Sequence, residues 1–262
     1  MTFMIFLPED QVNKQRREPY PAIYFLSGLT CNWENTATKG HYARQCKKSQ
    51  VAMVFPDTSP RGIEETIPNA GADWTVGYGA GQYCNATQAP WNQHFNMYTY
   101  VTEELPNLVE RYFPICPERR SVMGFSMGGN GALICAAKNP QRYRSVTALS
   151  PIGHPTQCEM FSTKALTAYF GGLDGQATEY SIVEVLNSLG TSLTLPPGYM
   201  DLAANDQFIE TLCWPNLIKA LRTNGHTSFP IHTHEDYNHS YFFVNDFIED
   251  HIAFHAGHLY SR

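Results

Sequence analysis

The residues best suited to chemistry surround Ser126, in the run Gly124-Phe125-Ser126-Met127-Gly128. An apolar run precedes this Gly-x-Ser-x-Gly pattern and an apolar helical pattern follows it, an arrangement typical of a nucleophile elbow. The glycines two positions before and after the serine remove side chains that would collide where a strand reverses into a helix. The first turn of that helix would direct free N–H groups toward negative charge developing in acyl transfer. The pattern predicts that Ser126 is a nucleophile, the alternative being a glycine-rich turn formed for packing alone.

A serine nucleophile needs a base, and the base needs an orienting carboxylate. When these groups follow an elbow of this kind, the acid comes first along the chain and the histidine second. The loop 203–208 follows an expected strand at 199–203 and contains Asp206, which we predict to be the acid. Asp201 lies within the strand, where a structural role is expected. A structural or helix-capping role is the alternative for Asp206.

The histidine is expected in the loop after the next strand, 229–233. His239 stands immediately before the last helical segment, and we predict that it is the base. His234 is a weaker candidate in the same loop. His232 falls inside the strand and is expected to be a packed or edge side chain.

The last helical segment carries His251, His255 and His258 at helical spacing. No neighbouring cysteine or carboxylate set completes a metal site around them. We therefore expect a solvated helix face there, no bound metal and no cofactor.

An oxyanion hole needs two N–H donors, one from the residue after the nucleophile and one from the loop after an earlier strand. Met127 is the first of these residues. The turn Ser27-Gly28-Leu29 follows an apolar strand, so the Leu29 amide is the predicted second donor.

Expected strands and helices alternate along the chain, which predicts an α/β fold: a mostly parallel sheet flanked by helices, with chemistry at the carboxyl ends of the strands. We expect a single α/β-hydrolase domain over residues 1–262, with a small excursion after the sixth strand and a kink or cap at Pro106. The polar stretch 10–19 is expected to be a turn and 153–175 to be irregular. The stretch 63–96 is aperiodic and reads as a functional loop. The expected strands are 2–7, 21–26, 51–55, 120–123, 145–149, 199–203 and 229–233, and the expected helices are 36–49, 97–112, 128–138, 181–189, 213–222 and 241–259.

Composition excludes several classes of protein. The net charge of -6 and the absence of a basic cluster argue against a nucleic-acid-binding protein. We see no secretory leader and no membrane span. Seven cysteines without paired spacing favour a reducing compartment, so we expect a cytoplasmic protein. A homodimer is compatible with the sequence, which does not give the oligomeric state.

Several motifs resemble those of the S-formylglutathione hydrolase family, also called esterase D. They follow the family's order over nearly the whole chain, at 25–31, 56–62, 79–83, 85–88, 100–106, 126–134, 205–208 and 237–243. The resemblance implies the α/β-hydrolase fold, a triad of Ser126, Asp206 and His239, and a small-molecule thioester substrate. The implied reaction is hydrolysis of S-formylglutathione to formate and glutathione, the last step of formaldehyde detoxification.

Three departures from the family concern substrate range most. The N-terminal edge segment of relatives is expected to be absent, Phe125 replaces a histidine common before the nucleophile, and the loop 156–164 differs. A broader carboxylesterase or acyltransferase is therefore the nearest alternative, and a noncatalytic binding protein is a remote one. Cys31, beside the oxyanion loop, is either a site of thiol inactivation or, as we expect, a buried structural cysteine.

Overall fold

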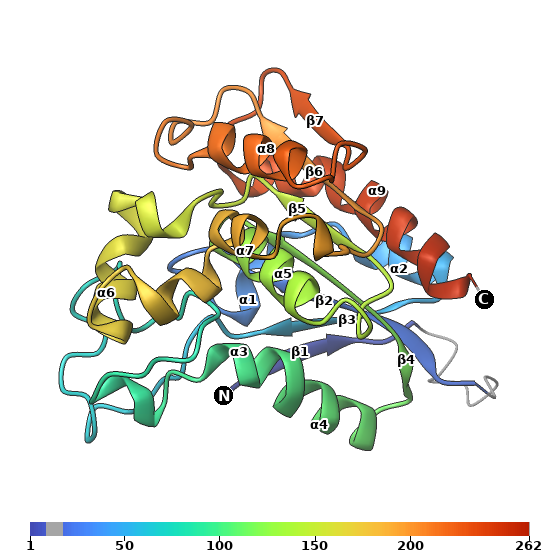
Figure 1. The fold of residues 1–262 in the computed structure, drawn as a ribbon. Helices are drawn as coiled ribbons and strands as arrows, with labels where there is room; N and C mark the ends of the chain where they lie inside the picture. The colour runs from blue at the N-terminus through green and yellow to red at the C-terminus, as the bar shows by residue number, and fades with distance from the viewer. Residues whose placement is uncertain (9–17, 262) are drawn as a thin grey trace.

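The protein is described by a computed structural model that covers residues 1–8 and 18–261; residues 10–17 of the turn expected at 10–19 lie outside these ranges. The described strands form one sheet in the order β1-β3-β2-β4-β5-β6-β7 (Figure 1). Only β1 pairs antiparallel; the other pairings are parallel. The strands are β1 (Phe3–Phe6), β2 (Tyr20–Leu26), β3 (Ala52–Pro56), β4 (Ile115–Phe125), β5 (Val146–Leu149), β6 (Gly198–Ala203) and β7 (Ile231–His234). The expected α/β-hydrolase sheet is confirmed.

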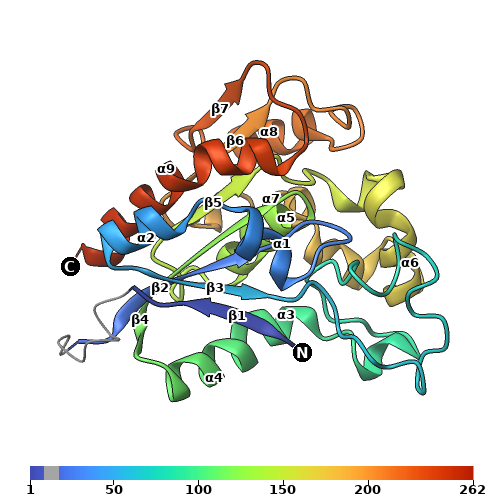
Figure 2. The same cartoon turned by 180° about the vertical axis from the view of Figure 1, so that it is seen from behind.

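Helices cover both faces of this sheet. One face carries α1 (Trp33–Lys39), α2 (Ala43–Ser49) and α9 (Tyr241–Tyr260), which lie in front of the sheet in Figure 2. The other face carries α4 (Leu105–Tyr112), α5 (Met127–Lys138) and α7 (Ile182–Leu189), while α8 (Trp214–Thr223) packs on α7. Every residue of β2 is buried, because alternate side chains enter the two cores. Such two-sided burial explains why its sequence is a continuous apolar run.

The helix expected at 36–49 is two helices. Asn32 caps α1, accepting a hydrogen bond from the Glu34 amide, so the first helix starts earlier than expected. Gly40 ends it, with its N–H bonded to the Thr36 carbonyl. A β-carbon at Gly40 would lie 2.8 Å from that same oxygen, so the glycine permits the break.

Pro106 interrupts the helix expected at 97–112. The chain passes from α3 (Met97–Thr99) through a π-helical segment (Tyr100–Glu104) into α4, whose first turn holds the proline. Proline has no N–H to donate to the carbonyl four residues earlier. The Arg142 guanidinium donates to that oxygen, on Thr102, at 2.8 Å. The expectation of a kink or cap at Pro106 is confirmed.

The excursion follows β5, the fifth strand of the described sheet, and not the sixth. It contains a π-helical segment (Glu159–Thr163), α6 (Lys164–Phe170) and α7 before the chain returns to β6. Part of the stretch expected to be irregular, 153–175, is thus helical.

The expectation of a solvated histidine face on the last helix is wrong for His251 and His255, which are fully buried. His251 is hydrogen bonded to Thr147 Oγ1 (2.7 Å) and Asp201 Oδ2 (3.1 Å). His255 is hydrogen bonded to Ser145 Oγ (2.7 Å) and Thr147 Oγ1 (2.8 Å). Polar side chains of the sheet satisfy the two rings, and burial lowers the pKa of both histidines, that of His255 well below its ordinary value.

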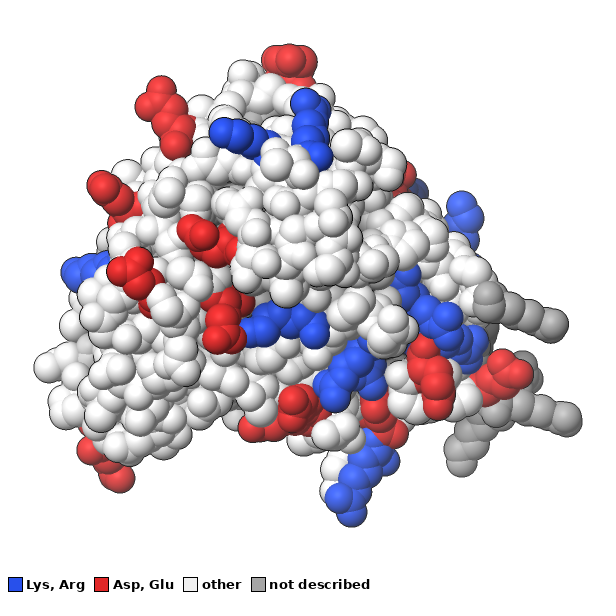
Figure 3. Space-filling view, in the orientation of Figure 1, with Lys and Arg blue, Asp and Glu red and all other residues white. Residues whose placement is uncertain are grey.

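Charged side chains of both signs are mixed on the surface. On the face shown in Figure 3, Lys and Arg side chains lie among Asp and Glu side chains and form no continuous basic area. Within the described ranges, no helix has the length and apolar character needed to cross a membrane.

Candidate active site

Ser126 lies at the sharp turn between β4 and α5 with φ 58° and ψ -119°, a strained conformation for a residue with a side chain. Both flanking glycines are required by close backbone contacts. A β-carbon on Gly124 would lie 2.1 Å from the Gly128 carbonyl oxygen, and one on Gly128 would lie 1.9 Å from the Leu26 carbonyl oxygen. The local geometry is therefore that of the elbow predicted from the sequence.

Asp206 and His239 come together from two loops that follow adjacent strands. His239 Nδ1 lies 2.6 Å from Asp206 Oδ2, and Asp206 Oδ1 accepts the Phe208 amide at 2.8 Å. The two loops are also joined by the His239 amide, which donates to Gln207 Oε1 at 3.0 Å. Asp206 is buried and both of its oxygens are occupied, so the carboxylate is fixed behind the imidazole.

Ser126 and His239 line the same cavity. With Nδ1 held by Asp206, His239 Nε2 is the ring atom that remains to accept a proton. In the described chain no hydrogen bond joins the Ser126 hydroxyl to His239, so proton transfer requires this pair to approach each other. Phe125 packs against the imidazole with ring centroids 4.6 Å apart, and Phe208 packs edge-on against it at 5.6 Å. These two aromatic contacts restrict the orientation of the ring.

The expected oxyanion donors flank the elbow. Met127 begins α5, and Leu29 lies in the loop after β2. That loop touches the nucleophile turn, because a β-carbon on Gly28 would lie 3.3 Å from the Ser126 β-carbon. Neither the Leu29 nor the Met127 N–H is bonded to another backbone group of the described chain. Both amides are thus available to bind negative charge.

A polar brace beneath the oxyanion loop was missed by the sequence reasoning. Arg61 forms a bidentate pair with Asp57 and donates to the Cys31 carbonyl at 3.2 Å. The Thr58 hydroxyl donates to the same carbonyl, and the Tyr83 hydroxyl donates to the Ser27 carbonyl at 2.8 Å. Three of these residues, Asp57, Thr58 and Arg61, lie in the motif 56–62, which the sequence analysis uses only for its resemblance to the family.

The cavity has a volume of about 510 Å³. Its wall is mainly apolar and aromatic, formed by Trp74, Met160, Phe161, Phe208 and Tyr241 among others. The loop 156–164, which the sequence predicts to differ from the family, contributes Met160 and Phe161 to the cavity wall.

Cys31 also lines the cavity but is only 8% exposed. Burial raises the pKa of its thiol. Because the thiolate is the reactive form, these features favour the structural role expected for this cysteine.

The weaker candidates lie elsewhere. Asp201, His232 and His234 contact one another but do not line the cavity. His234 belongs to β7 and not to the loop in which it was expected.

The sheet topology, the strained serine turn and the buried Asp–His pair define a hydrolase of the α/β-hydrolase fold. The model of the "Putative esterase" family matches residues 1–254. S-formylglutathione hydrolase of Mus musculus is 38% identical over 262 residues, covering 99% of this chain and 89% of that protein; the Rattus norvegicus protein is 39% identical with the same coverage. A solved structure of an S-formylglutathione hydrolase from Agrobacterium tumefaciens has a TM-score of 0.90 and 36% identity, covering 99% of this chain and 90% of that one. The chain belongs to the S-formylglutathione hydrolase family of esterases.

Proposed function

We propose that the protein hydrolyses the thioester S-formylglutathione to formate and glutathione, with Ser126, His239 and Asp206 as its catalytic triad. The observation that carries the mechanism is the 2.6 Å Asp206–His239 contact at the cavity that also holds Ser126. The substrate is that of the relatives described above, which match this chain over nearly its full length.

In the first half-reaction, His239 takes the Ser126 proton as the serine oxygen attacks the thioester carbonyl carbon. Asp206 stabilises the imidazolium that forms, and the Leu29 and Met127 amides hold the oxyanion. Collapse of the tetrahedral intermediate breaks the C–S bond, and the imidazolium proton passes to the departing thiolate. Glutathione is released, His239 is neutral again, and a formyl ester remains on Ser126.

In the second half-reaction, His239 takes a proton from water, which attacks the formyl ester. Formate is released, and the proton returns to the Ser126 oxygen. A thiol leaving group with a pKa near ~8.5 needs less help from an acid than an alcohol does. Hydrolysis of the formyl ester is therefore expected to limit turnover.

Steady-state kinetics on S-formylglutathione test the proposal, with Ser126→Ala as the inactive control. A fluorophosphonate probe should label Ser126 in the folded wild-type protein. Absence of both labelling and turnover would instead support a noncatalytic binding protein.

The apolar cavity wall favours one alternative, a carboxylesterase or acyltransferase of broader range, because a formyl group is too small to fill a cavity of about 510 Å³. Comparing kcat/KM for S-formylglutathione with values for short and long nitrophenyl esters separates the two. A clear preference for long acyl chains would contradict the thioester assignment.

We also propose a cytoplasmic location. All seven cysteines are free thiols and five are buried, which suits a reducing compartment. Fractionation of cells producing the native protein tests the location, and sedimentation of the purified protein distinguishes a monomer from a homodimer.

A further inference from the structure

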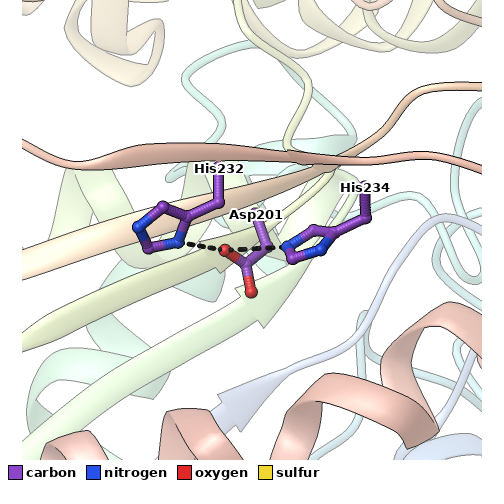
Figure 4. A group of neighbouring side chains, drawn as sticks. All are labelled: Asp201, His232 and His234. Atoms are coloured by element: carbon purple, nitrogen blue, oxygen red, sulfur yellow. Dashed lines mark hydrogen bonds and ion pairs between the residues drawn. The ribbon is translucent and has the colours of Figure 1, made fainter.

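Two histidines and an aspartate gather at the edge of the sheet, outside the active-site cavity. His232 and His234 are two residues apart on the edge strand β7, so their side chains share one face. Asp201 on β6 is directly opposite His232 in the register. Figure 4 shows the carboxylate between the two rings, with both contacts converging on one oxygen.

The distances are those of a partly assembled ligand set. His232 Nδ1 lies 2.8 Å and His234 Nε2 lies 3.4 Å from Asp201 Oδ1, and the three ligand atoms lie within 4.8 Å of one another. In a tetrahedral zinc site with bonds of 2.0–2.2 Å, neighbouring ligand atoms are separated by about 3.4 Å. His234 already has this separation. His232 needs to move by about half an ångström, and its side chain is 54% exposed and can do so.

One nitrogen in this group is poorly paired. His234 Nε2 is buried, and its contact with Asp201 Oδ1 at 3.4 Å is not a well-aligned hydrogen bond. The His234 ring is held against Phe247, with centroids 3.8 Å apart, so this nitrogen is fixed in place. A buried polar atom without a well-formed hydrogen bond is costly, and a cation shared with Asp201 would satisfy it.

The surroundings also suit a metal ion. Asp201 Oδ2 is hydrogen bonded to His251 Nε2 at 3.1 Å, and His251 Nδ1 to Thr147 Oγ1. Such outer contacts orient a metal-binding carboxylate. Exposed His232 provides solvent access and room for a water ligand.

We propose that Asp201, His232 and His234 bind a divalent transition metal ion, of which Zn²⁺ is the representative, through two imidazole nitrogens and one carboxylate oxygen. This site differs from the sequence-based expectation of no metal. Borderline metals suit imidazole ligands, whereas Mg²⁺ prefers an all-oxygen set. The ion links β7 to β6 just before the loops that carry Asp206 and His239. The Ala204 amide donates to the His234 carbonyl at 2.9 Å, so fixing His234 also fixes the start of the Asp206 loop.

The test is calorimetric titration of the full chain with Zn²⁺, and with Mg²⁺ as a comparison, under reducing conditions. We expect one equivalent of Zn²⁺ to bind and to raise Tm, and Mg²⁺ to do neither. His232→Ala and His234→Ala should each weaken binding by ~100-fold or more, above the loss typical of an outer-contact residue. The matched control His41→Ala removes an exposed histidine elsewhere and should retain wild-type affinity.

Circular dichroism and hydrolysis of a nitrophenyl ester without added metal verify that each variant is folded. Because the protein has seven free thiols, Co²⁺ is titrated as a spectroscopic substitute. Weak absorption without a thiolate–cobalt charge-transfer band supports the nitrogen and oxygen ligands. Absence of Zn²⁺ binding by the wild type, unchanged binding by His232→Ala, or a strong thiolate band would each overturn the proposal.

Discussion

Replacing Asp206 with asparagine tests the proposed triad most directly. In the structure the two carboxylate oxygens have separate tasks: Oδ1 accepts the Phe208 amide and Oδ2 contacts His239 Nδ1. Asparagine offers one oxygen acceptor and one NH₂ donor in their place. If its oxygen stays with Phe208, the NH₂ faces His239 and moves the ring proton to Nε2, where it blocks uptake of the serine proton.

The opposite orientation of the amide keeps the useful tautomer but directs NH₂ at the Phe208 N–H. That orientation leaves a buried donor without an acceptor, which costs about 1–3 kcal/mol of free energy. Either way the imidazolium loses its charged partner, which costs roughly a further 1.5–3 kcal/mol. The sum, about 2.5–6 kcal/mol, corresponds to a fall in kcat of ~10²–10⁴-fold.

The assay is steady-state hydrolysis of S-formylglutathione by Asp206→Asn, with Asp201→Asn as the matched control. Asp201 is also a buried carboxylate paired with histidines, but it lines no part of the cavity. Measured without added metal, so that the proposed ion does not contribute, the control is expected to change kcat by less than ~10-fold, because Asp201 touches no proposed catalytic group. The reasoning is refuted if Asp206→Asn keeps kcat within ~10-fold of wild type, or if the folded Asp201 variant loses as much.

Three further perturbations follow from the structure. Gly128→Ala places a β-carbon 1.9 Å from a carbonyl oxygen at the end of β2, so we expect loss of soluble protein or at least ~100-fold lower kcat. The control Gly257→Ala has open space around it and should leave kcat and Tm near wild type. Equal behaviour of the two variants would contradict this prediction. Arg61→Ala removes one of two donors to the Cys31 carbonyl, so kcat should fall ~10-fold while KM stays nearly constant. This fall is smaller than the ~10²–10³-fold loss of kcat typical when an oxyanion donor itself is removed. A change confined to KM would argue against the role of the brace. Burial lowers the pKa of His255, so below about pH 6.5 the unfolded chain binds a proton that the folded chain does not. The free energy of unfolding should therefore fall by up to about 1.4 kcal/mol per pH unit. Urea unfolding at several pH values should show a weaker dependence of this free energy on pH for His255→Gln, and an unchanged dependence would exclude His255 as the cause.

The residues of the proposed triad could be selected from the sequence because their signals are local. The elbow depends on backbone collisions within five consecutive residues, so glycine spacing alone reveals it. Asp206 and His239 each follow a strand with a readable apolar pattern, and a parallel sheet brings such loops to one edge. The order of the two residues along the chain, acid before histidine, predicts that they pair, and His239 Nδ1 lies 2.6 Å from Asp206 Oδ2.

Contacts between distant segments could not be read in this way. The sequence predicts a solvated face for His251 and His255 because no neighbouring cysteine or carboxylate set completes a metal site around them. The helix is instead apolar on several sides and packs on β2 and β4. The partners of these rings, Ser145 and Thr147, lie more than a hundred residues earlier in the chain. The sequence therefore shows the polar groups but not their pairing.

The histidines of α9 bear on how the protein is made. This helix leaves the ribosome after every strand of the described sheet, yet it satisfies Ser145, Thr147 and Asp201, which were synthesised long before. Until α9 has been synthesised, that side of the nascent sheet has neither its apolar cover nor its polar partners, and it is open to chaperones and to aggregation. A stop codon ahead of α9 would therefore cost much more than twenty surface residues: it would leave a chain unable to close one of its two cores.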